Sequence, residues 1–256
     1  MSGTGRTNSG HGRLGSVLSG LAVAVGCVLF LGGFVWGAVE YQPYTVPTDS
    51  MDPTVKAGDR VLAQRISGDE VRRGDVVVFK DVQWADMPMV KRVVGVGGDK
   101  VACCDSKGRL TVNGKPVEEP YVQRMPGGLA STTGFGATVP KGQLFLLGDE
   151  RSGSLDSRVH LQDQGQGSVP RSTVTARIDA VAWPPGSLVE RPQGFAELPG
   201  GVSEPGPVTL LLGSVVLGAV LILGGAAYGP VVRRMGGRRR TEPTGRAGGG
   251  VSTGVR

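Results

Sequence analysis

Two long segments without a single charged residue constrain this chain more than any other feature. The first runs from Leu14 to Val39, and the second from Pro205 to Val232, with its most apolar part at Val208–Tyr228. A helix needs about 20 apolar residues to cross about 30 Å of hydrocarbon, and both segments are long enough. The sequence therefore predicts two transmembrane helices, at 14–39 and 208–228, with the rest of the chain divided around them.

Each segment has an alternative interpretation. The first follows Arg6 and Arg13, as the apolar part of a cleavable signal peptide would, but such a part is about 7–15 residues long and ends at small residues. Here the run is longer, and Phe30, Phe34 and Trp36 occupy the place of a cleavage site, which favours an uncleaved anchor. The second segment could be the core helix of a soluble domain, although its glycines weaken a helix in water more than one in lipid.

The distribution of charge orients the two predicted spans. The formal net charge of +6 arises from the tails, because residues 1–14 and 229–256 together carry nine arginines and one glutamate. Lys and Arg stay on the cytoplasmic side of a membrane. We therefore expect a plasma-membrane protein with two spans, a basic cytoplasmic tail at 1–13, an Arg/Gly-rich cytoplasmic tail at 229–256 and an extracytoplasmic body. The slightly acidic body argues against nucleic-acid binding.

The body, residues 40–190, is expected to be mainly β. Short segments rich in Val, Leu and Phe alternate with Gly and Pro, and no stretch repeats its apolar residues every 3.6 positions. Asn113-Gly114 is a strong hairpin signal. This pattern predicts a coiled antiparallel β-sheet domain, a loop over Gly127–Gly136 and a linker at 191–207. The predicted strands are Arg60–Arg65, Asp75–Lys80, Met89–Val96, Gln143–Leu147 and Val174–Trp183, and Leu110–Val117 is the segment that contains the hairpin signal.

Three cysteines are too few for a disulfide framework or a zinc site, and we expect neither a metal nor a cofactor. Cys27 lies inside the first apolar segment, whereas Cys103 and Cys104 are neighbours. A disulfide between adjacent residues is geometrically unfavourable, so two unlinked, partly buried residues are the favoured interpretation. A vicinal or intermolecular bridge is the alternative that an oxidising compartment would permit.

The run Val46-Pro47-Thr48-Asp49-Ser50-Met51-Asp52-Pro53-Thr54 follows the first apolar segment closely. Each proline fixes its own φ and restricts the residue before it, so Ser50 lies in a locally rigid backbone. A serine displayed in this way can be a nucleophile, or simply part of a proline-bounded loop. A serine nucleophile needs a base, and His160, the one histidine of the body, has no spacing typical of a Ser-His-Asp triad.

Lysine can replace histidine as the base. Lys91 is the one lysine of the body embedded in an apolar run, with Met89-Val90 before it and Val93-Val94 shortly after. In a strand, residues 89, 91 and 93 share a face, so Lys91 would point toward apolar neighbours. Burial would lower its pKa from about 10.4 toward 7, which corresponds to roughly 4–5 kcal/mol of desolvation. An ordinary lysine whose head reaches water fits the sequence equally well.

Three motifs in this order behind an apolar segment resemble those of the bacterial type I signal peptidases. They are Ser-Met-x-Pro-Thr from Ser50, Lys-Arg-x-x-Gly-x-x-Gly-Asp from Lys91 (with glycines at 95 and 98), and Gly-Asp-x-x-x-x-Ser-x-Asp-Ser-Arg from Gly148. The resemblance covers roughly residues 40–185 and implies a membrane-bound serine endopeptidase that removes N-terminal signal peptides from exported preproteins. It implies a Ser-Lys dyad, with Ser50 as nucleophile and Lys91 as general base. It also implies a monomer whose partners are signal peptides and the lipid bilayer.

The resemblance assigns supporting roles as well. Ser154 matches a serine that hydrogen-bonds and orients the lysine, and Thr48 stands where the family often has a serine that contributes to the oxyanion hole. Asp156 and Arg158, with Asp149 in the same motif, match charged residues that brace the site. Asp49 is a departure, because many members have glycine there. The lining of the shallow apolar pockets for small substrate side chains matches Val46, Pro47, Met51, Val55, Met89 and Val90.

Two alternatives belong to other functional classes. A non-catalytic, membrane-anchored β module could bind exported chains without cutting them, although Ser50, Lys91 and Ser154 are all present. A self-cleaving Ser-Lys domain of the repressor type would be cytoplasmic and without anchors, so the two apolar segments count against it.

Overall fold

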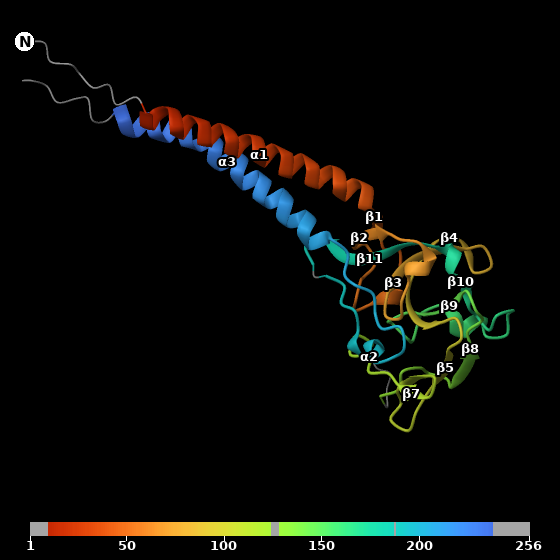
Figure 1. Ribbon diagram of the computed structural model, residues 1–256. Coiled ribbons are helices and arrows are strands. Elements are labelled where there is room, and N and C mark those ends of the chain that lie inside the picture. The colour runs from red at the N-terminus through yellow and green to blue at the C-terminus, as the bar shows by residue number, and fades with distance from the viewer. Residues whose placement is uncertain (1–9, 124–127, 187, 238–256) are drawn as a thin grey trace, which may run out of the picture. The chain divides into compact units, whose positions relative to one another are not determined.

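The computed structural model describes residues 10–123, 128–186 and 188–237, which are distributed over two compact units (Figure 1). The first unit contains the chain up to Phe34 and from Leu212 onward, and the second is Val35–Leu211. Residues 1–9 and 238–256 of the predicted cytoplasmic tails lie outside the described residues, as does Gly127 of the predicted loop.

The first unit is formed by parts of two long helices, α1 (Gly10–Glu40) and α3 (Val208–Gly237). Small residues allow these helices to touch: a Cβ on Gly26 would lie 2.8 Å from the carbonyl oxygen of Gly218. The hydroxyl of Ser19 donates to the carbonyl of Gly225 at 2.7 Å. Such close, small-residue contacts are how helices associate where surrounding lipid removes the hydrophobic drive for association.

Both helices are long and apolar enough to cross a membrane, over Gly15–Glu40 and Val208–Tyr228. Few of the side chains in these two stretches are buried. The stretches coincide closely with the segments predicted as spans, and α1 begins within the predicted tail 1–13. An exposed apolar surface of this extent is what a lipid-facing helix presents.

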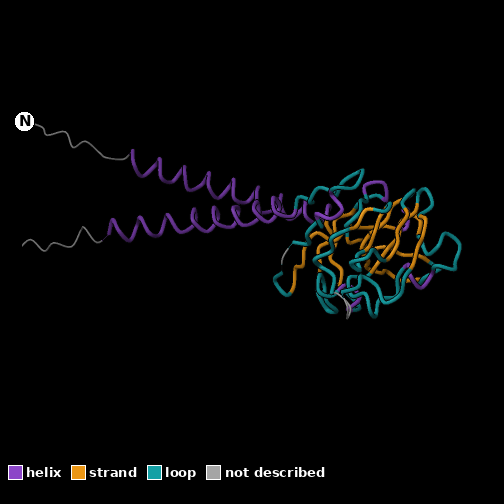
Figure 2. The backbone as a smooth tube through the Cα atoms, turned by 90° about the horizontal axis from the view of Figure 1, so that it is seen from below, coloured by secondary structure: helices purple, strands orange, loops and turns teal. Residues whose placement is uncertain are grey.

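The second unit contains two antiparallel sheets, which confirms the predicted mainly β architecture (Figures 1 and 2). The larger sheet has the strand order β1-β2-β11-β3-β4-β9-β10, and the smaller has the order β7-β6-β5-β8. The strands of the larger sheet are β1 (Tyr41–Thr45), β2 (Arg60–Arg65), β3 (Val76–Asp81), β4 (Ala85–Val96), β9 (Gln143–Leu147), β10 (Val169–Pro170) and β11 (Val174–Trp183). Those of the smaller are β5 (Lys100–Cys103), β6 (Leu110–Val112), β7 (Lys115–Pro116) and β8 (Phe135–Thr138).

Strand β3 lies inside the larger sheet and is buried on both faces. Val76 and Val78 pack in one apolar cluster, whereas Val77 and Phe79 pack in another. A strand that is buried on both faces has apolar residues at successive positions instead of alternating apolar and polar residues. This explains the Val-Val-Val-Phe sequence of β3. Strand β4 pairs with β3 on one side, and Lys91 lies opposite Val77 there.

A third apolar cluster joins the two sheets. Phe145 on β9 stacks on Phe135 of β8 with ring centroids 5.8 Å apart. Val94, Leu110 and Leu147 belong to the same buried cluster. Because its members come from both sheets, this cluster holds the smaller sheet against the strands β4 and β9.

The segment expected to be a linker, 191–207, packs against the body instead. It contains the short helix α2 (Gln193–Ala196), and Phe195 and Leu198 are buried in the cluster that joins the sheets. Arg191 forms ion pairs with Asp75 and Asp179. The sequence missed this because two isolated apolar residues among Pro and Gly show no periodicity.

At the smaller sheet one expectation is confirmed and another is corrected. Leu110–Val117 forms the predicted hairpin, β6–β7, which turns at Asn113 and Gly114 with φ of 53° and 76°. Phe135 and Gly136, placed by the sequence in a loop, belong to β8 and pair with Cys103 and Ala102 of β5. This pairing is between distant segments, so the short run around 135 carried no local strand signal.

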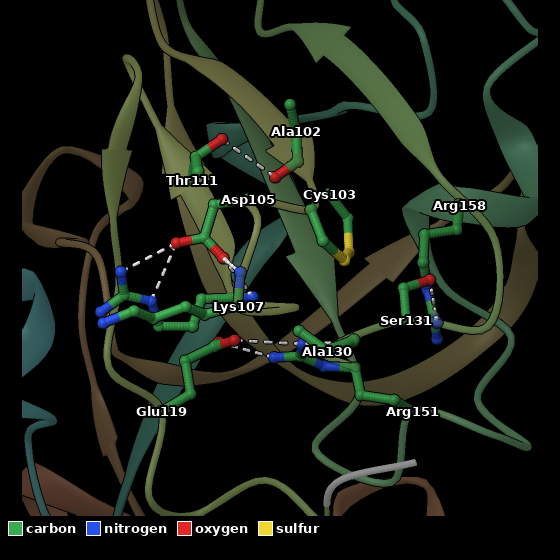
Figure 3. Close-up of a disulfide and its surroundings, with 12 residues drawn as sticks. Ala102, Cys103, Asp105, Lys107, Thr111, Glu119, Ala130, Ser131, Arg151 and Arg158 are labelled. Atoms are coloured by element: carbon green, nitrogen blue, oxygen red, sulfur yellow. Dashed lines mark hydrogen bonds and ion pairs between the residues drawn. A yellow bond between two sulfur atoms is a disulfide. The ribbon is translucent and has the colours of Figure 1, made fainter. Parts of the chain in front are cut away.

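Cys103 and Cys104, which the sequence analysis favoured as unlinked residues, form a disulfide (Figure 3). Strand β5 ends at Cys103. Within a strand, neighbouring side chains point to opposite faces of the sheet. Because the strand ends at Cys103, this rule does not keep the side chains of Cys103 and Cys104 apart. Cys103 is buried and Cys104 is exposed. The remaining cysteine, Cys27, is free.

Replacing Phe145 with Ala should lower the free energy of unfolding by about 3–5 kcal/mol, because the cluster between the sheets loses a fully buried ring. Phe145→Leu, which keeps much of the volume, should lower it by roughly 1 kcal/mol. Chemical denaturation of the full chain in detergent measures both. Equal, small effects of the two substitutions would contradict this account of how the sheets are joined.

Candidate active site

Ser50 lies in a 3-10 turn, Asp49–Met51, between β1 and β2. The next residue, Met51, is fully buried and packs with Val46 and Val55 in the cluster under the turn. The turn is also closed by a backbone hydrogen bond from Asp52 N–H to the carbonyl of Asp49, at 2.9 Å. The buried Met51 and the closed turn hold the half-exposed Ser50 in one place, with its hydroxyl at the surface.

Lys91 reaches Ser50 from the interior of β4. Its ammonium nitrogen Nζ is 2.8 Å from Ser50 Oγ and 3.1 Å from the carbonyl oxygen of Val90. The lysine side chain is buried, with 5% of its surface exposed. The distance between Nζ and Oγ is within the 2.6–3.2 Å that proton transfer between a base and a nucleophile requires. The fold thus brings together two residues that are 41 positions apart.

Burial lowers the pKa of Lys91 from 10.5 to about 8. Two carboxylates, Asp156 and Asp149, act in the opposite direction and favour the charged ammonium. Each of them is paired with an arginine, Arg158 and Arg92 respectively. Because those arginines neutralise the nearby negative charge, desolvation prevails and the amine loses its proton within a mildly alkaline range.

Asp149 lies beside Lys91 because of strand pairing. Leu147, the last residue of β9, pairs with Arg92, so the residues that follow Leu147 reach the dyad. Asp149 accepts two hydrogen bonds from Arg92, at 2.8 and 2.7 Å, and one from the hydroxyl of Thr54, at 2.5 Å. Arg92 and Asp149 are essentially fully buried. The pair of Arg92 and Asp149 therefore joins β4, at the residue after Lys91, to the turn that follows β9.

Asp156 braces the same turn from its other end. It accepts two hydrogen bonds from the Arg158 guanidinium, both at 2.8 Å, and one from the backbone N–H of Gly148 at 3.0 Å. Arg158 also donates to the hydroxyl of Ser131 at 3.2 Å. The residues Asp149, Asp156 and Arg158, which the resemblance placed in supporting roles, thus lie around Lys91 and Gly148.

Ser154 does not form the expected hydrogen bond to Lys91. Its hydroxyl is buried and has no hydrogen-bond partner within the described part of the chain. It lies against Gly148, where an added Cβ would collide with Ser154 and with the carbonyl oxygen of Ser50. The second acceptor for the Lys91 amine is instead the carbonyl of Val90, the preceding residue on β4.

Thr48 and Asp49 lie on the exposed side of Ser50. The hydroxyl of Thr48 donates to Ser50 Oγ at 3.2 Å, so the two hydroxyls lie side by side. The carboxylate of Asp49 accepts a hydrogen bond from the backbone N–H of Ala57, at 2.9 Å. Asp49, which stands where many family members have glycine, is therefore solvent-exposed, and its carboxylate is bound to the loop that contains Ala57.

The residues predicted to line substrate pockets are mostly buried. Val46, Met51, Val55 and Val90 share one core cluster, whereas Met89 packs with the cluster around Phe79. Pro47 is exposed. The first four can form the floor of a pocket beside Ser50, and their contact with substrate stays a prediction. A cavity of about 970 Å³ borders Thr54, Arg92 and Tyr121 but does not include Ser50 or Lys91.

His160 takes no part in the geometry of the dyad. Its ring stacks on Trp84 with centroids 4.7 Å apart, and Nδ1 lies 2.8 Å from a carboxylate oxygen of Asp163. No hydrogen bond joins it to Ser50 in the residues that the structure describes. Over the same residues, no group of three His, Cys, Asp or Glu side chains is arranged to hold a metal ion.

Sequence reasoning missed several residues that surround the dyad: Thr54, Arg92, Glu119, Tyr121 and Arg151. Arg92 and Arg151 lie inside the motifs from Lys91 and Gly148, so their position in those motifs was an available signal. Glu119 and Tyr121 had none, since their partners are about 30 positions away. Only the folded chain brings them to the site.

A serine hydroxyl next to a buried lysine amine on a β scaffold defines a candidate serine hydrolase, and comparisons with known proteins agree. The family model for signal peptidase, peptidase S26, matches residues 16–183. A "Probable signal peptidase I" of Mycobacterium leprae (strain TN) is 32% identical in an alignment of 200 residues that covers 56% of this chain and 69% of that protein. Signal peptidase I of Bacillus licheniformis is 34% identical over 173 residues, 64% of this chain and 86% of the relative.

A crystal structure of a signal peptidase I from Enterococcus faecalis V583 is 27% identical to the chain, with a TM-score of 0.35, and the match covers 41% of this chain and 94% of that one. The family model extends over well more than half of the sequence. The chain belongs to the signal peptidase family, peptidase S26. It is accordingly a hydrolase of the serine protease class.

If Lys91 is the base for Ser50, kcat/KM for a peptide substrate should rise with pH and level off above an apparent pKa of about 8, because only a neutral amine can accept a proton. Initial rates between pH 6 and 10 measure this. Lys100→Gln, a change at an exposed lysine of β5, should leave the midpoint in place. A profile without a limb in this range would contradict the assignment of Lys91 as base.

Lys91→Met should raise the free energy of unfolding by about 3 kcal/mol at neutral pH, because the folded wild type must bury an ammonium. The folded-state pKa is below the unfolded one, so the penalty is complete below pH 8. It disappears as the pH rises from about 8 toward 10.5. Unfolding of both proteins as a function of pH measures the difference, and a variant that is less stable than wild type at pH 7 would argue against the penalty.

Proposed function

We propose that this chain is a membrane-bound serine endopeptidase that cleaves N-terminal signal peptides from exported preproteins. The observation that carries the proposal is the 2.8 Å contact between the buried amine of Lys91 and the hydroxyl of Ser50. Membership of the signal peptidase family supplies the substrate class. The named relatives from Mycobacterium and Bacillus support the same substrate.

The first half of the reaction transfers the acyl part of the substrate to Ser50. The neutral amine of Lys91 accepts the proton of Ser50 Oγ while the oxygen attacks the carbonyl carbon of the scissile peptide bond. The ammonium so formed then gives its proton to the leaving amine nitrogen, and the C–N bond breaks. The mature chain departs with a new amino terminus, and the signal peptide remains as an ester on Ser50.

The second half returns the enzyme to its starting state. Lys91, again neutral, accepts a proton from a water molecule that attacks the ester carbon. The proton returns to Ser50 Oγ as the C–O bond breaks, and the signal peptide leaves as a carboxylic acid. One water molecule is consumed in each cycle.

The neighbouring residues have supporting parts in this proposal. The hydroxyl of Thr48 and the backbone N–H of Ser50 stabilise the negative oxygen of the tetrahedral intermediate, an effect typically of about 3–4 kcal/mol per donor. The pairs Asp149–Arg92 and Asp156–Arg158 hold the turn after β9 and balance the charge near the amine. The buried hydroxyl of Ser154 is available to the amine once the serine proton has moved.

Substrate selection follows from the surface beside the dyad. An extended peptide can lie against the strand edges next to Ser50 and Lys91 as an added strand. Shallow apolar pockets that admit small side chains are then lined by Val46, Pro47, Met51, Val55, Met89 and Val90. This fits the small residues that precede signal-peptide cleavage sites.

The proposed topology places the catalytic body at 40–190 outside the plasma membrane. Helices at 14–39 and 208–228 span the bilayer, and both basic tails stay in the cytoplasm. The segment 191–207 connects body and second span while packing on the body. We propose that the enzyme acts as a monomer, with both members of the dyad supplied by one chain. The alternative, an inactive module that binds exported chains, is disfavoured by the Lys91–Ser50 contact.

Ser50→Ala and Lys91→Ala should each reduce preprotein cleavage by about 10³-fold or more, since each removes a member of a unit that acts together. The assay is cleavage of a purified preprotein by the full chain in detergent, followed by identification of the new amino terminus. His160→Ala serves as the matched control and should remain active. Turnover retained by either dyad variant, or lost only with His160→Ala, would refute the mechanism.

A further inference from the structure

A buried cluster of charged residues lies behind the dyad and takes no part in the proton transfers proposed for Ser50 and Lys91. Glu119 accepts hydrogen bonds from both terminal nitrogens of Arg151, at 2.6 and 3.2 Å (Figure 3). Tyr121 donates its hydroxyl proton to Glu119 at 2.7 Å. The ring of Tyr121 lies 3.9 Å from the guanidinium carbon of Arg92. Glu119 is 4% exposed, and Arg92 and Arg151 are each 1% exposed.

The cluster reaches Lys91 by one route. The aromatic face of Tyr121 covers the guanidinium of Arg92, an arrangement that favours the cation electrostatically. Arg92 is the residue after Lys91 on β4 and is further held by the carbonyl of Gly74, at 2.7 Å. The ring of Tyr121 is therefore one of the contacts that fix the side chain next to Lys91 on β4.

The same cluster is connected to Ser50 by a second route, through Arg151. Arg151 donates from Nε to the carbonyl of Gly148, at 2.9 Å, and so fixes the turn after β9. Within that turn, the backbone N–H of Glu150 donates to the carbonyl of Ser50, at 3.2 Å. The hydrogen bond between Tyr121 and Glu119 joins the two routes, because each residue controls one of the arginines.

Glu119 and Tyr121 come from the short segment after β7, which the smaller sheet holds in place. Val117 and Val122 on either side are buried, and the N–H of Val122 closes a turn onto the carbonyl of Glu119 at 3.2 Å. Arg151 also donates to the carbonyl of Ala130, at 2.9 Å, in the loop before β8 (Figure 3). The smaller sheet thus contributes to the site from outside the three motifs.

We propose that Glu119 and Tyr121 are positioning residues for the reaction. Glu119 fixes Arg151 and Tyr121 fixes Arg92, and these two arginines hold the backbone next to Ser50 and Lys91. The same contacts keep the charges around the lysine amine balanced. The inference rests on the proposed Ser50–Lys91 mechanism. Neither residue touches the reacting atoms. Their effect should therefore appear in kcat and in the pH profile rather than in KM.

The charged groups around Lys91 come in pairs. Asp156 faces it with Arg158, and Asp149 with Arg92. Behind these lie Glu119 with Arg151, and the phenol of Tyr121, whose pKa is raised by burial and by Glu119, so that it stays protonated. Loss of the Glu119 charge alone would leave Arg151 uncompensated. An uncompensated cation disfavours a second positive charge on Lys91 and lowers its pKa.

The central experiment compares Glu119→Gln with wild type in the full chain, with a peptide substrate. The rising limb of the kcat/KM profile should move to lower pH by about 0.3 unit or more, because the buried negative charge that compensates Arg151 has been removed. Glu118→Gln is the matched control, since it removes the same charge from the neighbouring, exposed carboxylate. Its profile should coincide with that of wild type.

A second pair of variants tests the route through Arg92. Tyr121→Leu removes the ring and should lower kcat by about 10-fold with KM changed less than about 2-fold, because misplaced catalytic groups slow the reaction without altering substrate contacts. Tyr121→Phe keeps the ring and loses only the hydroxyl, so its loss should be smaller. These variants carry the test by themselves if Glu119→Gln fails to fold.

The proposal is overturned if folded Glu119→Gln has the midpoint of wild type and of Glu118→Gln, or if Tyr121→Leu keeps the wild-type kcat. Melting temperatures measured in parallel show which variants are folded. Ser50→Ala distinguishes this failure from failure of the proposed function. If Ser50→Ala is inactive while Tyr121→Leu is unaffected, only the positioning role is refuted.

Discussion

The contact between one buried lysine amine and one serine hydroxyl is the interaction on which the rest of this structure depends. An ammonium is strongly hydrated, so a fold that removes water from Lys91 must hold the side chain firmly where it cannot escape to solvent. Strand β4 does this by placing Lys91 between paired strands of the larger sheet. Ser50 is brought to the amine by a turn whose neighbours are fixed in the core.

Two opposing requirements explain the many arginine–carboxylate pairs around the dyad. The turn after β9 needs strong hydrogen bonds to keep its shape, and the carboxylates of Asp149 and Asp156 provide them. Bare carboxylates beside Lys91 would restore its positive charge. An arginine on each acid meets both needs, because the bidentate geometry is rigid and the pair is nearly neutral. Buried pairs of this kind contribute little net stability, which points to orientation and charge balance as their purpose.

Features with a local signal could be predicted from the sequence. Apolar segments near the two ends, the strands β2, β9 and β11, and the turn at Asn113-Gly114 all follow from short-range patterns. Features created by distant contacts could not. The pairing of Glu119 with Arg151, the burial of Phe195 and the strand at Phe135 each depend on residues far along the chain. The motifs identified Ser50 and Lys91 as partners, but the orphan hydroxyl of Ser154 emerged only from the packed site.

The most direct test of a neutral amine at Ser50 is the titration of Lys91 itself. Lysine labelled with ¹³C at Cε can be followed by NMR in detergent micelles, and the signal that is missing from Lys91→Met identifies the residue. A midpoint near pH 8, well below the ordinary lysine value of 10.5, is the result that this account predicts. A Lys91 signal with a midpoint near 10.5 would contradict it.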